Sequence, residues 1–260
     1  MTIWKAIIIS LLFVFLGSFT YSVLDILKLL LNLDKYQYSF YQIFINIIAQ
    51  FCSFLIIKRI FFSSEKISLK KVPVNFFITL VFVLFILGDF IFQYGFNNIL
   101  DIILKTNTMS NVNGGDIPFS YFVLRLVKGC LIAPVVEELF FRKFIQGNLV
   151  RRYSNTFALI SASILFSLYH TDLNSSFQIF ILGIVLGVIF LKTQRIEYSI
   201  LFHSISNFVF YVINYYYTEK SMQNSSYNLI YIALGLIIIM IGILILKRGN
   251  NLYEKSRENL

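Results

Sequence analysis

The sequence predicts an all-α, polytopic membrane protein with about eight transmembrane helices. Hydrophobic residues make up 58% of the 260 residues and charged residues only 13%, and the mean hydropathy of +0.77 exceeds that of a soluble domain with a solvated surface. Apolar runs of roughly 20 residues, the length needed to cross a hydrocarbon core of ~30 Å, recur along the whole chain. Short polar loops separate these runs, which indicates one multi-helix membrane domain.

The first apolar run resembles a signal peptide in its basic flank, but no small-residue cleavage site follows it, so we assign it as a membrane helix. The next few residues, 25–33, are expected either to extend this helix or to form an interfacial helix. Hydropathy and periodicity then place the remaining helices. The expected spans are 4–23, 39–57, 74–94, 119–150, 154–169, 175–191, 198–217 and 227–246.

Basic residues occur in alternate connections, and this predicts the orientation of the chain. Lys and Arg collect at 58–71, 151–152, 192–195 and 247–257, whereas the loops at 107–116, 171–174 and 218–226 are nearly free of them. Because basic loops stay on the cytoplasmic side, both termini are expected in the cytoplasm. The formal charge of +9 comes from these scattered flanks and not from one face, so we expect no nucleic-acid partner.

Two adjacent glutamates, Glu137 and Glu138, lie deep within the fourth expected span. Inserting an ionisable side chain there costs roughly 2.5–3.5 kcal/mol, so each is a functional candidate by default. Arg142 follows Glu138 by four residues, so the two are expected to pair on one helix face. Glu137 points about 100° away and must face another group. Pro134 lacks an N–H, so it is expected to free the carbonyl of Cys130 and to kink the helix before the acids.

The only two histidines of the sequence lie in or at the end of expected membrane helices. Helix lengths place His170 at the depth of Glu137, and His203 reaches that depth if the intervening hairpin protrudes or a helix tilts. A carboxylate and two imidazoles are a common ligand set of catalytic zinc, and a free carboxylate can also activate water. Asn207, one turn after His203, is a candidate donor to a developing oxyanion. A hydrogen-bonded core histidine is the alternative for either imidazole alone.

A glycine pair, one aspartate and two cysteines also allow structural predictions. Gly183 and Gly187 form a G-x-x-x-G pattern, for which close packing within the chain is favoured over dimerisation. Asp89 in the third span is expected to pair with Arg125 or Lys128, or else to line a water-filled cavity. The two cysteines fall in apolar spans and are expected to be buried free thiols.

The polar residues resemble the motif set of the CAAX prenyl protease / bacteriocin-processing family of intramembrane proteases, also called the CPBP or ABI family. The resemblance covers about 134–208, and no matched position departs from the pattern. The motifs E-E-x-x-x-R, F-x-x-x-H and H-x-x-x-N/D are matched, in family order, by Glu137, Glu138 and Arg142, by Phe166 and His170, and by His203 and Asn207.

The resemblance implies a transmembrane protease domain at 1–247, with a motif-bearing core at about 119–217 and a charged cytoplasmic tail at 248–260. Glu137 would be the general base or a metal ligand. His170 and His203 would be ligands, or proton-transfer and oxyanion groups, and Asn207 an oxyanion donor. The supporting residues would be Glu138 and Arg142.

The resemblance also implies an intramembrane metalloendopeptidase that hydrolyses a membrane-associated peptide or protein, with the lipid bilayer as its surroundings. The resemblance does not decide between two ways of activating the water. In one, Glu137, His170 and His203 hold a divalent metal ion, for which zinc is the first candidate; in the other, the glutamate activates the water without a metal. The oligomeric state, the substrate and its prenylation stay undetermined. A non-catalytic scaffold or bacteriocin self-immunity factor is the alternative, and a proton-relaying transporter is a third. The abundance of Ile, Asn, Lys and Phe suggests an AT-rich genome, which is compatible with a Gram-positive bacterium, so a bacterial plasma membrane is the expected location.

Overall fold

The structure is a computed structural model, and it describes residues 1–32, 35–69, 76–104, 119–170, 175–216 and 227–258. Over these residues the chain is helical and contains no strand, so the predicted all-α class is confirmed. The basic-poor loops at 107–116, 171–174 and 218–226 lie outside the described residues. The helices are α1 (Ile3–Leu31), α2 (Lys35–Phe61), α3 (Phe76–Leu104), α4 (Phe119–Leu126), η2 (Val127–Ile132), α5 (Ala133–Glu137), η3 (Glu138–Gln146), α6 (Gly147–Val150), α7 (Asn155–Tyr169), α8 (Ser176–Thr193), α9 (Ile196–Tyr216) and α10 (Asn228–Glu258).

The helices occur where the hydropathy of the sequence places membrane spans. Among the described residues, six helices are long and apolar enough to cross a bilayer, and two shorter apolar helices lie at Ile3–Phe19 and Asn155–Tyr169. These eight coincide with the eight expected spans, and the chain is an integral, multi-pass membrane protein. Residues 25–31 extend α1, as one of the two alternatives for this segment predicted.

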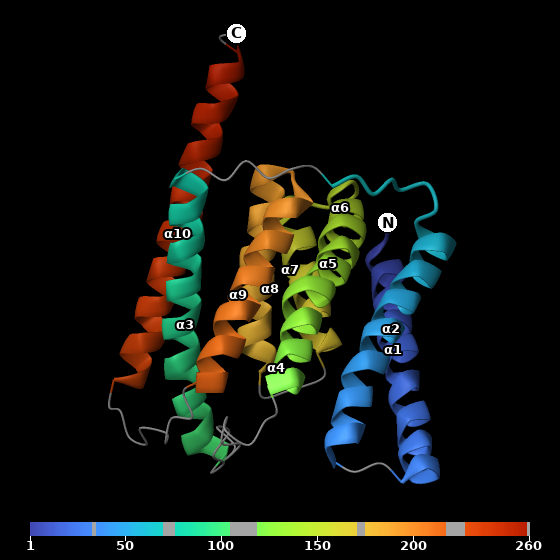
Figure 1. Ribbon diagram of the computed structural model, residues 1–260. Helices are drawn as coiled ribbons and strands as arrows, with labels where there is room; N and C mark the ends of the chain where they lie inside the picture. The colour runs from blue at the N-terminus through green and yellow to red at the C-terminus, as the bar shows by residue number, and fades with distance from the viewer. Residues whose placement is uncertain (33–34, 70–75, 105–118, 171–174, 217–226, 259–260) are drawn as a thin grey trace.

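Both chain ends lie at the same end of the helical bundle (Figure 1). The connection after α2 and the turn after α6, both rich in basic residues, lie at that end as well. Ser154 begins α7 with its hydroxyl oxygen accepting a hydrogen bond from the Phe157 amide, which explains why the chain can turn back within four residues of Val150. This common end is the one that the charge pattern assigns to the cytoplasm.

The long span from Phe119 to Val150 is a composite helix in which two π-helical segments, η2 and η3, flank the short helix α5. Pro134 lies at the start of α5. In η2 the Ala133 amide donates to the Lys128 carbonyl, five residues back. In this register the amide missing from Pro134 leaves the Gly129 carbonyl without its helical donor. The freed carbonyl is therefore that of Gly129, and the expectation of Cys130, which assumed α-helical spacing, is shifted by one residue.

Three groups of helices lie side by side: α1 with α2, the central helices α4 to α9, and α3 with α10 (Figure 1). Glycines bring α3 and α10 into close contact, since a Cβ at Gly95 would lie 2.6 Å from the Asn228 carbonyl and one at Gly235 would lie 2.6 Å from the Gly88 carbonyl. Such backbone contacts leave α3 little freedom to rotate about its axis.

Aromatic side chains connect α1 to the composite helix and α7. The ring of Phe13 on α1 stacks on Phe140 with centroids 4.2 Å apart and on Tyr169 at 5.2 Å, while Phe141 packs edge-on against Phe166. The four phenylalanine rings are among the most buried side chains of the core, and Tyr169 is partly buried. The motif-bearing helices are thus packed against a helix that carries no motif.

The G-x-x-x-G glycines pack within the chain, as favoured by the sequence. A Cβ at Gly183 would lie 3.2 Å from Ser163 Cβ, and one at Gly187 would meet Leu159 on α7 and Gln146 Oε1 at 2.9 Å. Both cysteines are free; Cys130 is buried as expected, but Cys52 is exposed on the outer surface of α2, so the expectation of burial was wrong for it.

Candidate active site

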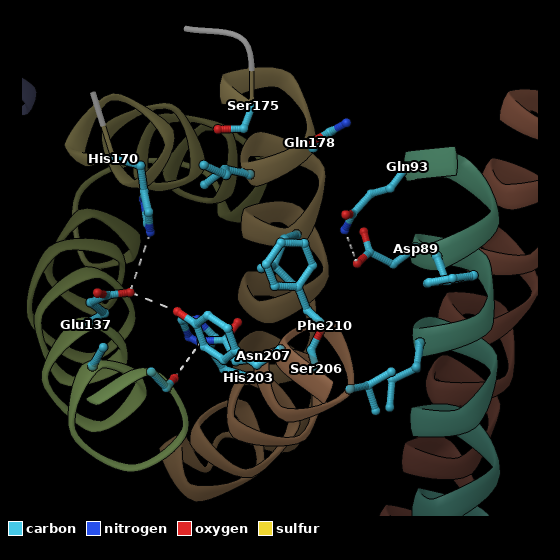
Figure 2. Close-up of a pocket in the computed structure, with 18 of the residues that line it drawn as sticks. Asp89, Gln93, Glu137, His170, Ser175, Gln178, His203, Ser206, Asn207 and Phe210 are labelled. Atoms are coloured by element: carbon cyan, nitrogen blue, oxygen red, sulfur yellow. Dashed lines mark hydrogen bonds and ion pairs between the residues drawn. The ribbon is translucent and has the colours of Figure 1, made fainter. Parts of the chain in front are cut away.

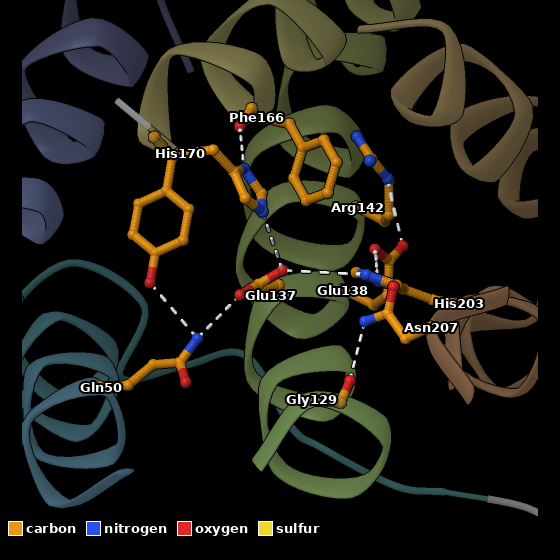
Figure 3. A network of polar contacts seen from close by, with 10 residues as sticks. Gln50, Gly129, Glu137, Glu138, Arg142, Phe166, His170, His203 and Asn207 are labelled. Carbon is orange, nitrogen blue, oxygen red and sulfur yellow. Dashed lines mark hydrogen bonds and ion pairs between the residues drawn. The ribbon is translucent and has the colours of Figure 1, made fainter. Parts of the chain in front are cut away.

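Three helices bring Glu137, His170 and His203 together in the interior of the bundle (Figure 3). Glu137 ends α5, His170 caps the C-terminus of α7 and His203 lies one-third of the way along α9. The Nε2 atoms of His170 and His203 lie 3.8 and 4.0 Å from the same oxygen, Oε2 of Glu137. Glu137 and His203 are 5% and 2% exposed, whereas the His170 side chain is 30% exposed, so the meeting point is buried except on the side of His170.

The other ring nitrogen of each histidine is held by a hydrogen-bond acceptor. His170 Nδ1 lies 2.9 Å from the Phe166 carbonyl oxygen, and His203 Nδ1 lies 3.0 Å from Glu138 Oε1. A carbonyl or carboxylate oxygen can only accept, so both Nδ1 atoms carry the proton. In the neutral rings both Nε2 atoms are then lone-pair acceptors that face a carboxylate oxygen.

Glu138 and Arg142 form the predicted i,i+4 pair, with Arg142 Nε 3.1 Å from Glu138 Oε2 and both side chains 0% exposed. The guanidinium also lies over the Phe166 ring, with its carbon 4.6 Å from the ring centroid. The structure adds a role that the spacing did not predict, because the second carboxylate oxygen of Glu138 holds His203. The pair therefore orients one imidazole as well as stabilising the buried charge.

Gln50 on α2 is a site residue that sequence reasoning missed. Its Nε2 donates to Glu137 Oε1 at 2.9 Å and to the Tyr169 hydroxyl at 3.2 Å (Figure 3). With Oε1 engaged in this way, Oε2 is the oxygen left to face the histidines. The signal available in the sequence was an amide near the middle of an apolar span, which costs free energy in lipid unless it has a partner, but Gln42 and Asn46 in the same span give the same signal.

Asn207 lies one turn after His203 and donates from Nδ2 to the Gly129 carbonyl at 2.7 Å. This is the carbonyl that Pro134 leaves without a helical donor. The proline therefore determines where the Asn207 amide is held, and the second N–H of that amide remains for another acceptor. A Cβ at Gly129 would collide with the Tyr211 ring, so the absence of a side chain lets α9 approach this closely.

Two cavities meet at Glu137. One of about 350 Å³ lies between α3, α8, α9 and the composite helix, and its walls include Glu137, His170, His203 and Asn207 (Figure 2). The other, of about 230 Å³, lies on the α1 and α2 side and also reaches Glu137 and His170. The larger volume falls within the roughly 300–1,000 Å³ typical of ligand pockets.

Asp89 lines the larger cavity, which agrees with the second alternative for this residue. Its Oδ2 accepts a hydrogen bond from Gln93 Nε2 at 2.7 Å. Within the described part of the chain, its carboxylate is in no ion pair with Arg125 or Lys128, so the favoured structural pair is not formed.

The donors of the site fit a metal ion by their chemistry, since zinc prefers imidazole and carboxylate ligands and metal-binding histidines are anchored through their other nitrogen. Atoms bound about 2.0–2.2 Å from a tetrahedral ion lie roughly 3.3–3.6 Å apart. The observed separations of 3.8 and 4.0 Å would have to shorten by a few tenths of an ångström. As the described side chains stand, no group of three or more His, Cys, Asp and Glu is placed to hold a metal ion.

Part of the chain is similar to known proteins. Residues 119–209 match the model of a family described as type II CAAX prenyl endopeptidase Rce1-like. Over these residues the chain is similar to the CAAX prenyl endopeptidase family. All seven motif residues named above fall within the matched segment, whereas Gln50 and Asp89 lie outside it.

A protein of Bacillus subtilis (strain 168) named "Putative membrane peptidase YdiL" is 29% identical over 84 residues. These residues are 32% of this chain and 34% of that protein, so the match spans about a third of the length of each. No solved structure matches the chain. The family match thus covers the segment that supplies Glu137, His170, His203 and Asn207.

Proposed function

We propose that this chain is an intramembrane endopeptidase that hydrolyses a peptide bond in a membrane-associated peptide or protein by means of an activated water molecule. The observation that carries the proposal is the pair of imidazole Nε2 atoms facing one oxygen of Glu137, at 3.8 and 4.0 Å. The site would lie within the bilayer, and the substrate would reach it there. We also propose that the protein lies in a bacterial plasma membrane with both termini in the cytoplasm.

The proton count of the site favours a bound water or ion. Three lone-pair acceptors converge, namely Oε2 of Glu137 and the two Nε2 atoms. A water molecule has two hydrogens and can donate to two of these acceptors, so the third group must carry a proton or face a cation. This requirement makes the site a place where water is held close to a base.

In the proposed reaction, Glu137 takes a proton from the water as its oxygen bonds to the carbonyl carbon of the scissile peptide. The protonated carboxyl then gives this proton to the nitrogen of the leaving amine as the C–N bond breaks. Asn207, with an N–H to spare, donates to the oxyanion that forms on the carbonyl oxygen, together with an imidazolium if one is present. Gln50 and Glu138 keep the carboxylate and His203 in position.

A divalent ion, zinc first, would be held by Glu137, His170 and His203. When bound, it would supply Lewis-acid polarisation and a lower pKa for the water. Metal analysis of the purified protein separates the two forms of the proposal. Close to one equivalent of zinc that is lost in His170→Ala and His203→Ala supports a metalloprotease, and activity without bound metal supports activation by Glu137 alone.

The proposal is tested by comparing the membrane peptides of cells that carry the native chain or Glu137→Gln. Mass spectrometry should find new peptide termini that depend on the native carboxylate. Equal insertion of both proteins in the membrane, measured by quantitative blotting, is the control. Identical termini in the two samples would contradict proteolysis and favour the scaffold or immunity factor.

A further inference from the structure

Asp89 is a buried carboxylate whose charge is only partly compensated. The residue is 6% exposed and lies on the membrane-spanning helix α3. Gln93 donates to Oδ2, but Oδ1 has no hydrogen-bond partner. Within the described ranges no Lys, Arg or His nitrogen comes within 4.0 Å of this carboxylate, although Lys128 lines the same cavity. A buried carboxylate without a cationic partner is costly within a membrane, so its retention requires a reason.

The position of Asp89 supplies that reason. Figure 2 shows Asp89 and Gln93 facing the larger cavity from α3, on the side opposite Glu137 and His170. The other face of α3 is fixed against α10 by backbone contacts of Gly88 and Gly95. The carboxylate is therefore presented to the space where a substrate of the proposed endopeptidase would lie.

The side chains of α3 that line the larger cavity favour one kind of ligand. One carboxylate beside an amide donor is a poor site for a hard metal ion, which takes six or more oxygen ligands. A protonated nitrogen on a flexible chain is a better partner, because it can reach Oδ1 while its apolar stem lies against Ile86 and Phe90 of the same wall. Lysine and arginine are the residues whose side chains carry a protonated nitrogen on a flexible apolar stem.

We propose that Asp89 determines specificity by binding a Lys or Arg side chain of the substrate, within a few residues of the scissile bond. This inference rests on the proposed function and specifies its substrate class. Asp89 is a binding residue in this account and takes no part in the proton transfers at Glu137.

The test compares peptide termini in cells that carry the native chain, Glu137→Gln, Asp89→Asn or Glu65→Gln. Asparagine keeps the shape of Asp89 and removes its charge. Glu65 pairs with Arg151 at the end of the bundle, so Glu65→Gln neutralises a carboxylate outside the cavity. Glu137-dependent cleavage sites should be enriched in nearby Lys or Arg, and Asp89→Asn should lower their yield about tenfold or more, while Glu65→Gln leaves them unchanged.

A second measurement uses purified protein in phosphatidylglycerol nanodiscs with a synthetic peptide that spans the best-cleaved site. Replacing its basic residue by glutamine should reduce cleavage by the native chain about tenfold, and should have little effect with Asp89→Asn. Glu137-dependent termini without basic enrichment, or with yields unchanged by Asp89→Asn, would overturn this inference alone. No Glu137-dependent termini at all would overturn the proposed function together with it.

Discussion

The carboxylate of Glu138 joins Arg142 to His203, with Oε2 3.1 Å from Arg142 Nε and Oε1 3.0 Å from His203 Nδ1. Adjacent glutamates in this helix therefore have different surroundings. Glu138 is enclosed by a guanidinium and an imidazole N–H, whereas Glu137 accepts from the Gln50 amide and faces two imidazole lone pairs. The first arrangement encloses the carboxylate of Glu138 between two donors, and the second leaves one oxygen of Glu137 directed toward the space between the two imidazoles.

The dual role of Glu138 predicts that its stabilising and positioning effects can be separated. Glu138→Ala leaves the Arg142 guanidinium buried without an acidic partner and should destabilise the protein by about 3–5 kcal/mol. The double variant Glu138→Leu with Arg142→Leu removes both charges and should recover most of this loss. Its activity should nevertheless stay low, because His203 has lost its acceptor. Thermal unfolding in detergent and cleavage assays measure the two effects, and a double variant with restored activity would refute the positioning role.

Gln50 should matter for activity although it lies outside the family match. Gln50→Leu removes the donor to Glu137 Oε1 and lets the carboxylate rotate, so the cleavage rate at saturating substrate should fall about 10- to 100-fold. The control is Tyr169→Phe, which removes the second acceptor of the same amide and leaves its contact with Glu137 in place. We expect its rate to stay within about threefold of the native value. Equal losses in both variants would mean that the Gln50 contact to Glu137 has no special role.

Pro134 should affect catalysis through Asn207. Pro134→Ala supplies an amide that competes for the Gly129 carbonyl, so the Asn207 side chain loses its fixed position and the cleavage rate should fall about tenfold. The thermal midpoint should not fall, because the helix gains a hydrogen bond. In a double-mutant cycle with Asn207→Ala the two effects should be strongly non-additive. Additive losses would show that the proline acts elsewhere.

Gly187 should be required for the packing of α8 on α7, which carries His170. A Cβ there meets Leu159 and Gln146, so Gly187→Ala should cost about 1–3 kcal/mol of stability. The matched control is Gly17→Ala on α1, where a Cβ has nothing within 4 Å. That substitution should be neutral or stabilise by up to about 1 kcal/mol. Unfolding of both variants in a detergent titration gives the comparison, and equal stabilities would contradict the packing role of Gly187.

The spans and the three motifs could be predicted from the sequence because they depend on local properties. Hydropathy over some twenty residues identifies a membrane helix, and the i,i+4 spacing of Glu138 and Arg142 places them on one face. The convergence of Glu137 with His170 followed from helix lengths and the antiparallel connection, whereas that of His203 was expected only if the intervening hairpin protruded or a helix was tilted. Hydropathy, i,i+4 spacing and helix length change little when a predicted helix end is wrong by a few residues.

The features that were not predicted depend on register or on contacts between distant helices. The π-helical hydrogen bond from Ala133 to Lys128 moves the freed carbonyl by one residue, which no spacing rule for an α-helix reveals. The contact from Gln50 to Glu137 joins residues 87 positions apart. Asp89 meets no arginine or lysine in the described structure because its face of α3 is turned toward a cavity, and helix periodicity alone did not specify which neighbour lies there.

The most direct test of the account is cleavage of a mapped substrate peptide by purified protein in water enriched in heavy oxygen. The native chain should place the heavy oxygen in the new carboxyl terminus, and Glu137→Gln should slow this incorporation by about 100-fold or more while retaining its fold. Incorporation at the native rate by Glu137→Gln would contradict the claim that this carboxylate, facing two imidazoles, activates the water.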